Sequence, residues 1–183
     1  MILASASPRR KELLALAGFD FQIETAAVEE TYDPTLPPEQ IVMHLAAVKS
    51  APVAARHPDE TVIGADTVVV LDEAILGKPH STDEAKAMLR RLSGRVHQVY
   101  TGVCLRRGET VVRFAECTLV HFKVLSEEEI AAYVATGEPM DKAGAYGVQG
   151  RGCVLVEGIE GDYFNVVGLP VSRLYDEIKK LGG

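Results

Sequence analysis

Residues 61–71 form an apolar run that reads Thr61-Val62-Ile63-Gly64-Ala65-Asp66-Thr67-Val68-Val69-Val70-Leu71. β-branched residues dominate this run, which predicts a long strand. Apolar side chains fall on both faces of such a strand, so we expect both faces to be buried. The run therefore belongs inside a sheet, and Asp66 is the one charge within it.

Helical and strand patterns alternate around this run. Helices are expected over Pro8–Ala17, from Pro38, after capping boxes that begin at Ser81 and Ser126, and from Val171 to Leu181. Further strands are expected at Met1–Leu3, Phe19–Glu24, Val96–Arg106, Thr110–Val124 and Val154–Val156. Arg107-Gly108-Glu109 separates two of these strands as a hairpin turn would. The order predicts a mixed α/β fold with an antiparallel part.

Composition narrows the class of protein. The chain has 183 residues, 47% of them hydrophobic, and a net charge of −7. This acidic balance argues against a general nucleic-acid binder. No segment approaches the roughly 20 apolar residues that span a bilayer, and no secretory signal is present, so we expect a cytoplasmic protein without membrane contact. Neither the three cysteines nor the five histidines have metal-ligand spacing.

The start of the first helix is unusually basic. Ser7 is a good N-cap and Pro8 suits the first helical position. Arg9, Arg10 and Lys11 then occupy the first turn, where the helix dipole disfavours cations. Backbone N–H groups, seryl hydroxyls and guanidinium groups together predict a polyanion site. Taken alone, the segment also fits a helix start with solvated basic residues.

Asp66 is the second candidate functional residue. A carboxylate within an apolar strand is unfavourable unless it is paired or binds a cation. One interpretation places Asp66 at a strand edge or bulge. The other makes it a rigidly held carboxylate that binds Mg²⁺ or takes a proton from water, with Gly64 and Ala65 leaving room for a ligand.

Two lysines and two glutamates extend this site. Lys49 lies late in the second predicted helix, and Lys78 is presented beside Pro79. Alone, each lysine is typical of a surface residue. With Arg9 and Arg10 they could neutralise a triphosphate. Glu29 and Glu30 then become candidate metal ligands.

A glycine-rich segment runs from Asp141 to Gly152. Its glycines indicate tight turns or close contacts, and a purely structural turn would explain them. The spacing matches neither a dinucleotide-binding fingerprint nor a P-loop. Gln149 lies within it, and its paired donor and acceptor suit the edge of a nucleobase.

These segments together resemble the Maf family of nucleoside triphosphate pyrophosphatases. The resemblance spans essentially the whole chain, in the family's order. It rests on Ser5 to Arg10, Gly64 to Val69, Lys78-Pro79, Leu92-Ser93-Gly94 with His97-Gln98-Val99, Asp141 to Gly150, and Val167-Gly168-Leu169-Pro170. It implies one domain over residues 1–183, with an elongated mixed sheet flanked by helices and two lobes around a nucleotide cleft.

The resemblance also assigns roles to residues. Asp66 matches the family's catalytic proton acceptor. Arg9, Thr67 and Gln149 match its specificity positions, and their identities are those of the dTTP/UTP-hydrolysing subgroup. The phosphate-binding residues would be Ser7, Arg10, Lys49 and Lys78, and the metal ligands would be Glu30 and Asp66.

The expected activity is metal-dependent hydrolysis of dTTP, UTP and modified pyrimidine nucleotides to a nucleoside monophosphate and pyrophosphate. The cofactor would be Mg²⁺ or Mn²⁺, and the protein would form a homodimer. Two alternatives stay open. One is a purine-directed pyrophosphatase that removes non-standard nucleotides, and the other is a non-catalytic nucleotide sensor linked to septum formation.

Overall fold

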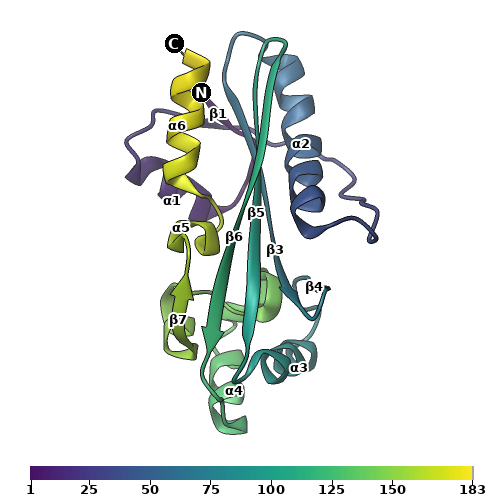
Figure 1. The fold of residues 1–183 in the computed structure, drawn as a ribbon, viewed down its shortest axis with the longest axis vertical. Coiled ribbons are helices and arrows are strands. Elements are labelled where there is room, and N and C mark those ends of the chain that lie inside the picture. The colour runs from purple at the N-terminus through teal and green to yellow at the C-terminus, as the bar shows by residue number, and fades with distance from the viewer. Residues whose placement is uncertain (183) are drawn as a thin grey trace. The chain divides into compact units, whose positions relative to one another are not determined.

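The computed structural model describes residues 1–182 as a mixed seven-stranded sheet with flanking helices (Figure 1). The strands are β1 (Ile2–Leu3), β2 (Gln22–Ile23), β3 (Val62–Leu71), β4 (Ala74–Leu76), β5 (Val96–Arg107), β6 (Thr110–Phe122) and β7 (Val156–Glu160). The helices are α1 (Pro8–Leu16), α2 (Pro38–Arg56), α3 (Thr82–Leu92), α4 (Glu127–Val134), α5 (Tyr163–Val167) and α6 (Val171–Gly182). Three short 3₁₀ helices are η1 (Glu138–Asp141), η2 (Ala143–Ala145) and η3 (Gly150–Leu155). This confirms the predicted α/β class.

The sheet is mixed in strand direction. Its order is β2-β1-β3-β5-β6-β7, and β4 pairs with β3 outside this path. Strand β1 runs parallel to both β2 and β3, whereas β4 is antiparallel to β3 and β7 is antiparallel to β6. Every residue of β3 except the partly exposed Thr67 is buried, which confirms the burial predicted for residues 61–71.

The chain divides into two compact units. Unit 1 consists of Met1–Thr67, Thr101–Glu116 and Phe164–Gly183, and unit 2 of Val68–Tyr100 and Cys117–Tyr163. Strands β3, β5 and β6 contribute residues to both units.

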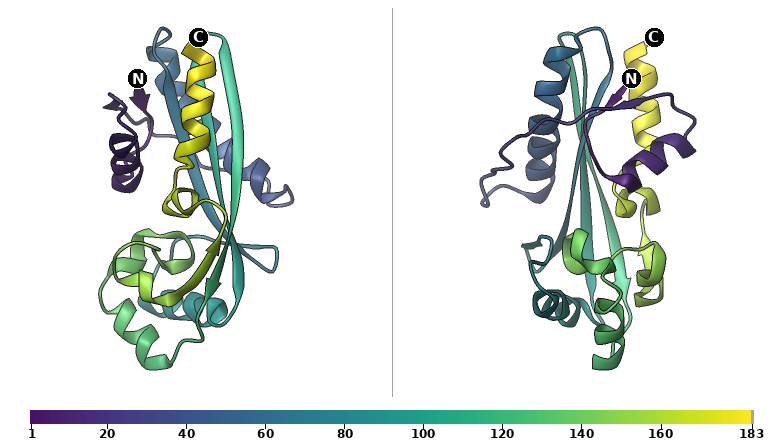
Figure 2. Two further views of the ribbon diagram at one scale, coloured as in Figure 1. Left: turned by 60° about the vertical axis from the view of Figure 1, so that its left-hand side comes forward. Right: turned by 180° about the vertical axis from the view of Figure 1, so that it is seen from behind.

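Within unit 1, α2 covers one face of the strands, and α1 and α6 cover the other (Figures 1 and 2). Helix α2 lies very close to β3. A Cβ added at Gly64 would overlap the carbonyl oxygen of Ala46 and lie 2.9 Å from Cβ of Ser50. The space beside Gly64 is therefore filled by α2, and the prediction that Gly64 leaves room for a ligand is wrong.

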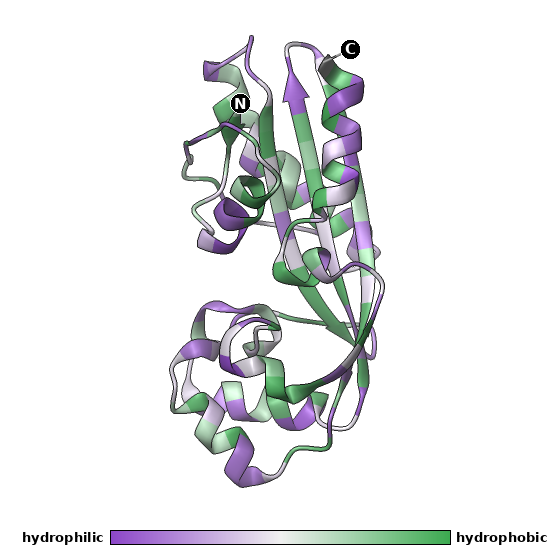
Figure 3. Ribbon diagram, turned by 90° about the vertical axis from the view of Figure 1, so that its left-hand side faces the viewer, coloured by the Kyte–Doolittle hydropathy of each residue, from purple (hydrophilic) through white to green (hydrophobic). Residues whose placement is uncertain are grey.

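Unit 2 contains β4, β7, α3, α4 and the three short 3₁₀ helices. Helix α3 packs against α4 and η2. His97 and Phe122 stack edge-on with Tyr146, and His97 Nε2 lies 2.7 Å from the Tyr146 hydroxyl. Hydrophobic residues run along the strands of each unit, whereas the helices carry both hydrophobic and hydrophilic residues (Figure 3). No helix within residues 1–182 combines the length and apolar character needed to cross a membrane.

The capping boxes are confirmed to different degrees. Ser126 Oγ accepts from the Glu129 amide, and the Glu129 carboxylate accepts from the Ser126 amide, so this box is complete. Ser81 Oγ accepts from the Glu84 amide as predicted. The Glu84 carboxylate instead accepts from the amide of His80, at 2.7 Å.

Three short elements differ from the predictions. The Phe19–Glu24 strand is reduced to Gln22–Ile23, because only these residues pair with β1. Strand β4 was not predicted. The strand expected at Val154–Val156 begins only at Val156, because the preceding residues form η3, in which Val154 is 63% exposed.

Candidate active site

The start of α1 forms as predicted. Ser7 is the N-cap, and its Oγ accepts from the Arg10 amide at 3.5 Å. The Ser7 amide donates to Ser5 Oγ at 3.3 Å. Arg9 and Arg10 lie in the first turn of α1, at the positive end of the helix dipole. This turn contains no acidic residue that would offset their charge. This arrangement attracts an anion.

Arg10 is built into the protein interior. Its Nε donates to the Gly168 carbonyl at 2.9 Å, and its two terminal nitrogens donate to Ser5 Oγ and Thr67 Oγ1, each at 3.1 Å. Burial lowers the pKa of Arg10, and the nearby Asp66 carboxylate opposes this shift. The guanidinium group of an arginine is not deprotonated in proteins, so Arg10 keeps its charge. Arg10 thus fixes Thr67 and places a positive charge near Asp66.

The hydroxyl of Thr67 has a defined orientation. Thr101 Oγ1 donates to the carbonyl of Asn165 at 2.9 Å. Thr101 has a single hydroxyl proton, so it must accept the hydrogen bond that joins it to Thr67, also at 2.9 Å. Thr67 therefore donates to Thr101 and accepts from Arg10. Its proton is used within the protein, and only its second lone pair and its methyl group are left for a substrate.

Asp66, Lys49 and Glu30 form one charged cluster. Lys49 Nζ lies 2.5 Å from Asp66 Oδ1 and 2.8 Å from Glu30 Oε2. The side chain of Asp66 is 13% exposed and that of Glu30 is 52% exposed. Asp66 is thus held on a buried strand, and Glu30 lies on the loop that precedes α2. Pairing with Lys49 explains how β3 tolerates a carboxylate.

The cluster offers oxygen ligands rather than a complete metal cage. Among residues 1–182, no group of three or more His, Cys, Asp or Glu side chains could hold a metal ion. The two carboxylates of the cluster, from Asp66 and Glu30, are both paired with the ammonium group of Lys49.

Lys78 and Gln149 belong to unit 2, whereas every other predicted site residue belongs to unit 1. Lys78 is exposed, and it follows Gly77, whose carbonyl accepts from the Gly144 amide at 3.0 Å. Gln149 is half-buried at the N-cap of η3. The segments that carry Lys78 and Gln149 are therefore joined by a backbone hydrogen bond within unit 2.

Sequence reasoning missed Glu138 and Tyr133. Their side chains hold the backbone on both sides of Gln149, through contacts described below. No motif or spacing in the sequence links these two residues to the glycine-rich segment. Their role depends on how the segment folds back.

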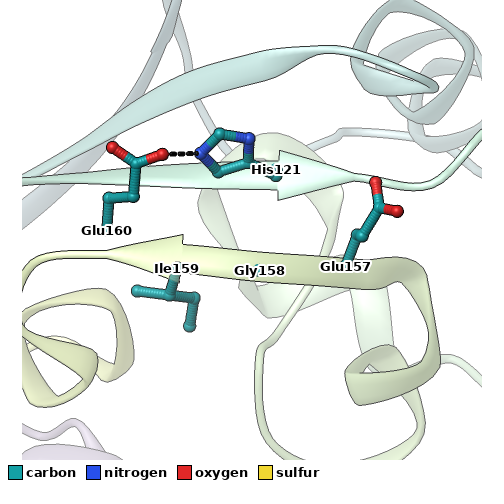
Figure 4. Close-up of a pocket in the computed structure, with 5 residues that line it drawn as sticks. All are labelled: His121, Glu157, Gly158, Ile159 and Glu160. Atoms are coloured by element: carbon teal, nitrogen blue, oxygen red, sulfur yellow. Dashed lines mark ion pairs between the residues drawn. The ribbon is translucent and has the colours of Figure 1, made fainter.

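Unit 2 also carries a surface depression. It is lined by His121 of β6 and by Glu157, Gly158, Ile159 and Glu160. Figure 4 shows His121 pointing toward Glu160, and its Nε2 lies 2.8 Å from the carboxylate. None of the predicted site residues lines this depression.

Comparison with known proteins identifies the family. A protein described as dTTP/UTP pyrophosphatase from Bacillus mycoides (strain KBAB4) is 54% identical over 180 residues, covering 98% of this chain and 94% of that protein. A protein of the same name from Geobacillus sp. (strain WCH70) is 56% identical over 182 residues, covering 100% and 98%. The solved structure of the Staphylococcus aureus Ham1 protein matches with a TM-score of 0.46 and 15% identity, covering 70% of this chain and 87% of that one. The model of the Maf-like protein family matches residues 1–181, and the chain belongs to this family.

Proposed function

We propose that this chain is a nucleoside triphosphate pyrophosphatase that hydrolyses dTTP and UTP to the nucleoside monophosphate and pyrophosphate. The observation that carries the proposal is the Asp66–Lys49–Glu30 cluster beside the basic start of α1. It combines a fixed carboxylate with cations suited to phosphate groups. Relatives that are 54% and 56% identical bear the name dTTP/UTP pyrophosphatase.

Asp66 is the proposed proton acceptor. It orients a water and removes its proton as the oxygen attacks phosphorus, which breaks the bond between the α and β phosphates. Lys49 holds the carboxylate in place at 2.5 Å. Arg9, Lys49 and Lys78, with the buried charge of Arg10 and the hydroxyl of Ser7, stabilise negative charge on the phosphates, which is the main source of catalysis in phosphoryl transfer.

We also propose a divalent cation, Mg²⁺ or Mn²⁺, as cofactor. The donor set fits, because Glu30 and Asp66 offer hard carboxylate oxygens near one another, both within 2.8 Å of Lys49 Nζ. When bound, the cation would polarise phosphate oxygens and offset their charge. Glu29, the other glutamate considered, is exposed.

Base selection is assigned to Gln149, with Arg9 and Thr67 completing the dTTP/UTP pattern. An amide offers one donor and one acceptor, which match O4 and N3–H of uracil or thymine. We extend the proposal to modified pyrimidine triphosphates that keep this edge, and to assembly as a homodimer.

The test is a pyrophosphate-release assay across canonical and modified nucleoside triphosphates, with Mg²⁺, with Mn²⁺ and with a chelator. We expect dTTP and UTP to be hydrolysed fastest, and the chelator to abolish release. A preference for purines would support the purine-directed alternative. Nucleotide binding without pyrophosphate release would support the sensor.

A further inference from the structure

The segment Gly147–Gly152 carries Gln149 but contains three glycines. Glycine has the largest backbone freedom, so a chain of this composition is flexible unless other groups hold it. A base-reading amide needs a fixed position, because loosely held hydrogen-bonding groups discriminate poorly. The contacts that hold this segment therefore bear on selectivity.

The side chains of Glu138 and Tyr133 bind the backbone on both sides of Gln149. Glu138 Oε2 accepts from the Arg151 amide at 3.0 Å, and Oε1 accepts from the Gly152 amide at 3.1 Å. The Tyr133 hydroxyl accepts from the Gly147 amide at 3.1 Å and donates to Glu138 Oε1 at 3.0 Å. One connected network thus holds three amides of the segment.

The segment also fits closely around these two side chains. Gly150 has a φ of +64°, and a Cβ built there would lie 2.8 Å from Glu138 Oε2. A Cβ at Gly152 would lie 2.1 Å from the Gly147 carbonyl oxygen and 2.8 Å from the Tyr133 hydroxyl. The positive φ of Gly150 and the close approach of Gly152 to the Gly147 backbone require glycine, and Glu138 and Tyr133 occupy the space beside both positions.

The residues that hold the segment are themselves fixed. Tyr133 lies on α4 and is 5% exposed. The backbone of Glu138 accepts from Lys142 Nζ at 2.7 Å and donates to Thr136 Oγ1 at 3.1 Å. Burial favours the protonated form of Glu138, but the amides of Arg151 and Gly152 and the Tyr133 hydroxyl outweigh this and lower its pKa. The carboxylate is therefore ionised at neutral pH and can accept all three hydrogen bonds.

We propose that Glu138 is a positioning residue that fixes the backbone around Gln149 and thereby sets the preference for pyrimidine triphosphates. The inference rests on the proposed function, since it assigns Glu138 a part in the selectivity given to Gln149. Glu138 acts through the backbone of residues 147–152. Tyr133 supports it by holding Gly147 and by donating to the carboxylate.

The main variant is Glu138→Gln, and Glu127→Gln is its matched control. A glutamine at position 138 keeps one acceptor oxygen and places an N–H₂ group against a backbone amide. Glu127 lies on α4 of the same unit and pairs with Arg90 at the surface. We expect Glu138→Gln to lower the UTP-to-ATP ratio of kcat/KM about fivefold or more, mainly through a higher KM for UTP, and Glu127→Gln to leave it unchanged.

Hydrogen exchange supplies a readout that needs no activity. The amides of Arg151 and Gly152 should exchange at least about tenfold faster in Glu138→Gln than in the parent. Tyr133→Phe removes one hydroxyl and should accelerate exchange at Gly147. If Glu138→Gln unfolds, the same exchange and ratio measurements on Tyr133→Phe decide the matter.

The outcomes separate the two proposals. If the parent protein fails to hydrolyse UTP and dTTP, the proposed function fails, and the exchange data still test whether Glu138 holds the segment. If the parent is active and exchange accelerates with an unchanged substrate ratio, Glu138 is a structural residue only and the inference is overturned. Unchanged exchange overturns it as well.

Discussion

The two units hold their candidate functional groups by different means. In unit 1, Asp66, Lys49 and Arg10 lie on regular elements and are fixed by contacts between charged or polar side chains. In unit 2, Lys78 and Gln149 lie on loops whose backbone groups are held by a backbone hydrogen bond between Gly144 and Gly77 and by the side chains of Glu138 and Tyr133. Strand β3 and helix α2 thus support Asp66 and Lys49, whereas a loop supports the side-chain amide of Gln149.

This difference agrees with the two tasks proposed for the site, which are phosphate chemistry and base recognition. Phosphate chemistry is the same for every nucleotide, and a rigid carboxylate with fixed cations suits it. Base recognition differs between enzyme subgroups, and it is assigned to the glycine-rich segment that carries Gln149 rather than to β3. The comparison predicts that changes in the Asp66–Lys49–Glu30 cluster affect turnover, and that changes in the segment around Gln149 affect substrate choice.

The largest effect should follow from Asp66→Asn in unit 1. The carboxamide lacks the basicity to accept a proton from water, so turnover should fall about 10²-fold or more. Nucleotide binding and the melting temperature should change little, because Lys49 keeps Glu30 as partner. Steady-state kinetics and a thermal melt measure this. The control is Asp72→Asn, which changes a surface carboxylate that pairs with Arg95. If Asp66→Asn is as active as the parent, Asp66 has no part in the mechanism.

Acid should destabilise the protein through His97 in unit 2. Burial, with a smaller contribution from His121, lowers the pKa of His97 to about 4. An unfolded histidine has a pKa near 6.5, so the stabilisation is complete above pH 6.5 and is lost as the pH falls toward 4. The loss reaches about 3 kcal/mol, at 1.36 kcal/mol per pKa unit.

Urea unfolding at pH 7 and at pH 4.5 measures this dependence. His97→Gln retains a hydrogen-bonding group for Tyr146 but does not titrate, so its stability should vary less with pH than that of the parent. His44→Gln, at an exposed position on α2, is the control. Equal pH dependence in His97→Gln and the parent would contradict the assignment.

Removal of single cations should have a smaller effect on kinetics. We expect Arg9→Ala and Lys78→Ala each to lower kcat/KM for UTP about 10- to 100-fold, because phosphate charge is left uncompensated. The melting temperatures should barely change, since Lys78 is exposed and Arg9 lies at the start of α1. Lys11→Ala, at an exposed position on the same helix, should behave as the parent. A variant with parental kinetics would assign that cation to the solvated surface.

The smallest effect is expected for Gln149→Ala. Loss of the amide should lower the UTP-to-ATP ratio of kcat/KM about tenfold at most, while turnover at saturating UTP stays within about twofold of the parent. Kinetics at one fixed Mg²⁺ concentration measure both quantities. A fall in turnover with an unchanged ratio would contradict the assignment of base selection to the segment around Gln149.

Local patterns predicted much of this structure. The apolar run of β3, the hairpin of β5 and β6 and the Ser126 capping box all depend on neighbouring residues, and all form as expected. Strand β4 escaped prediction because its turn places Asp72 and Glu73 at positive φ, where glycine or asparagine would have given the signal.

The candidate site was predictable only in part, because some of its contacts join residues that are far apart in the sequence. The charge within an apolar strand pointed to Asp66, and the basic first turn pointed to Arg9 and Arg10. Nothing local showed that Arg10 would be buried against Gly168, which lies 158 residues away. The bonds from Glu138 likewise reach 13 and 14 residues along the chain, to amides that any residue carries.

The absence of a side chain at Gly64 has a consequence for anyone who redesigns this protein. Gly64 and Asp66 lie on the same face of β3, two residues apart, and Gly64 touches the turn of α2 that carries Lys49. Because Gly64 has no side chain, α2 packs close enough to β3 for the Lys49 ammonium group to contact the Asp66 carboxylate. Even an alanine at position 64 would push α2 away from β3 and lengthen the distance between Lys49 Nζ and Asp66 Oδ1. A mutational library should therefore leave Gly64 untouched and vary the loops instead.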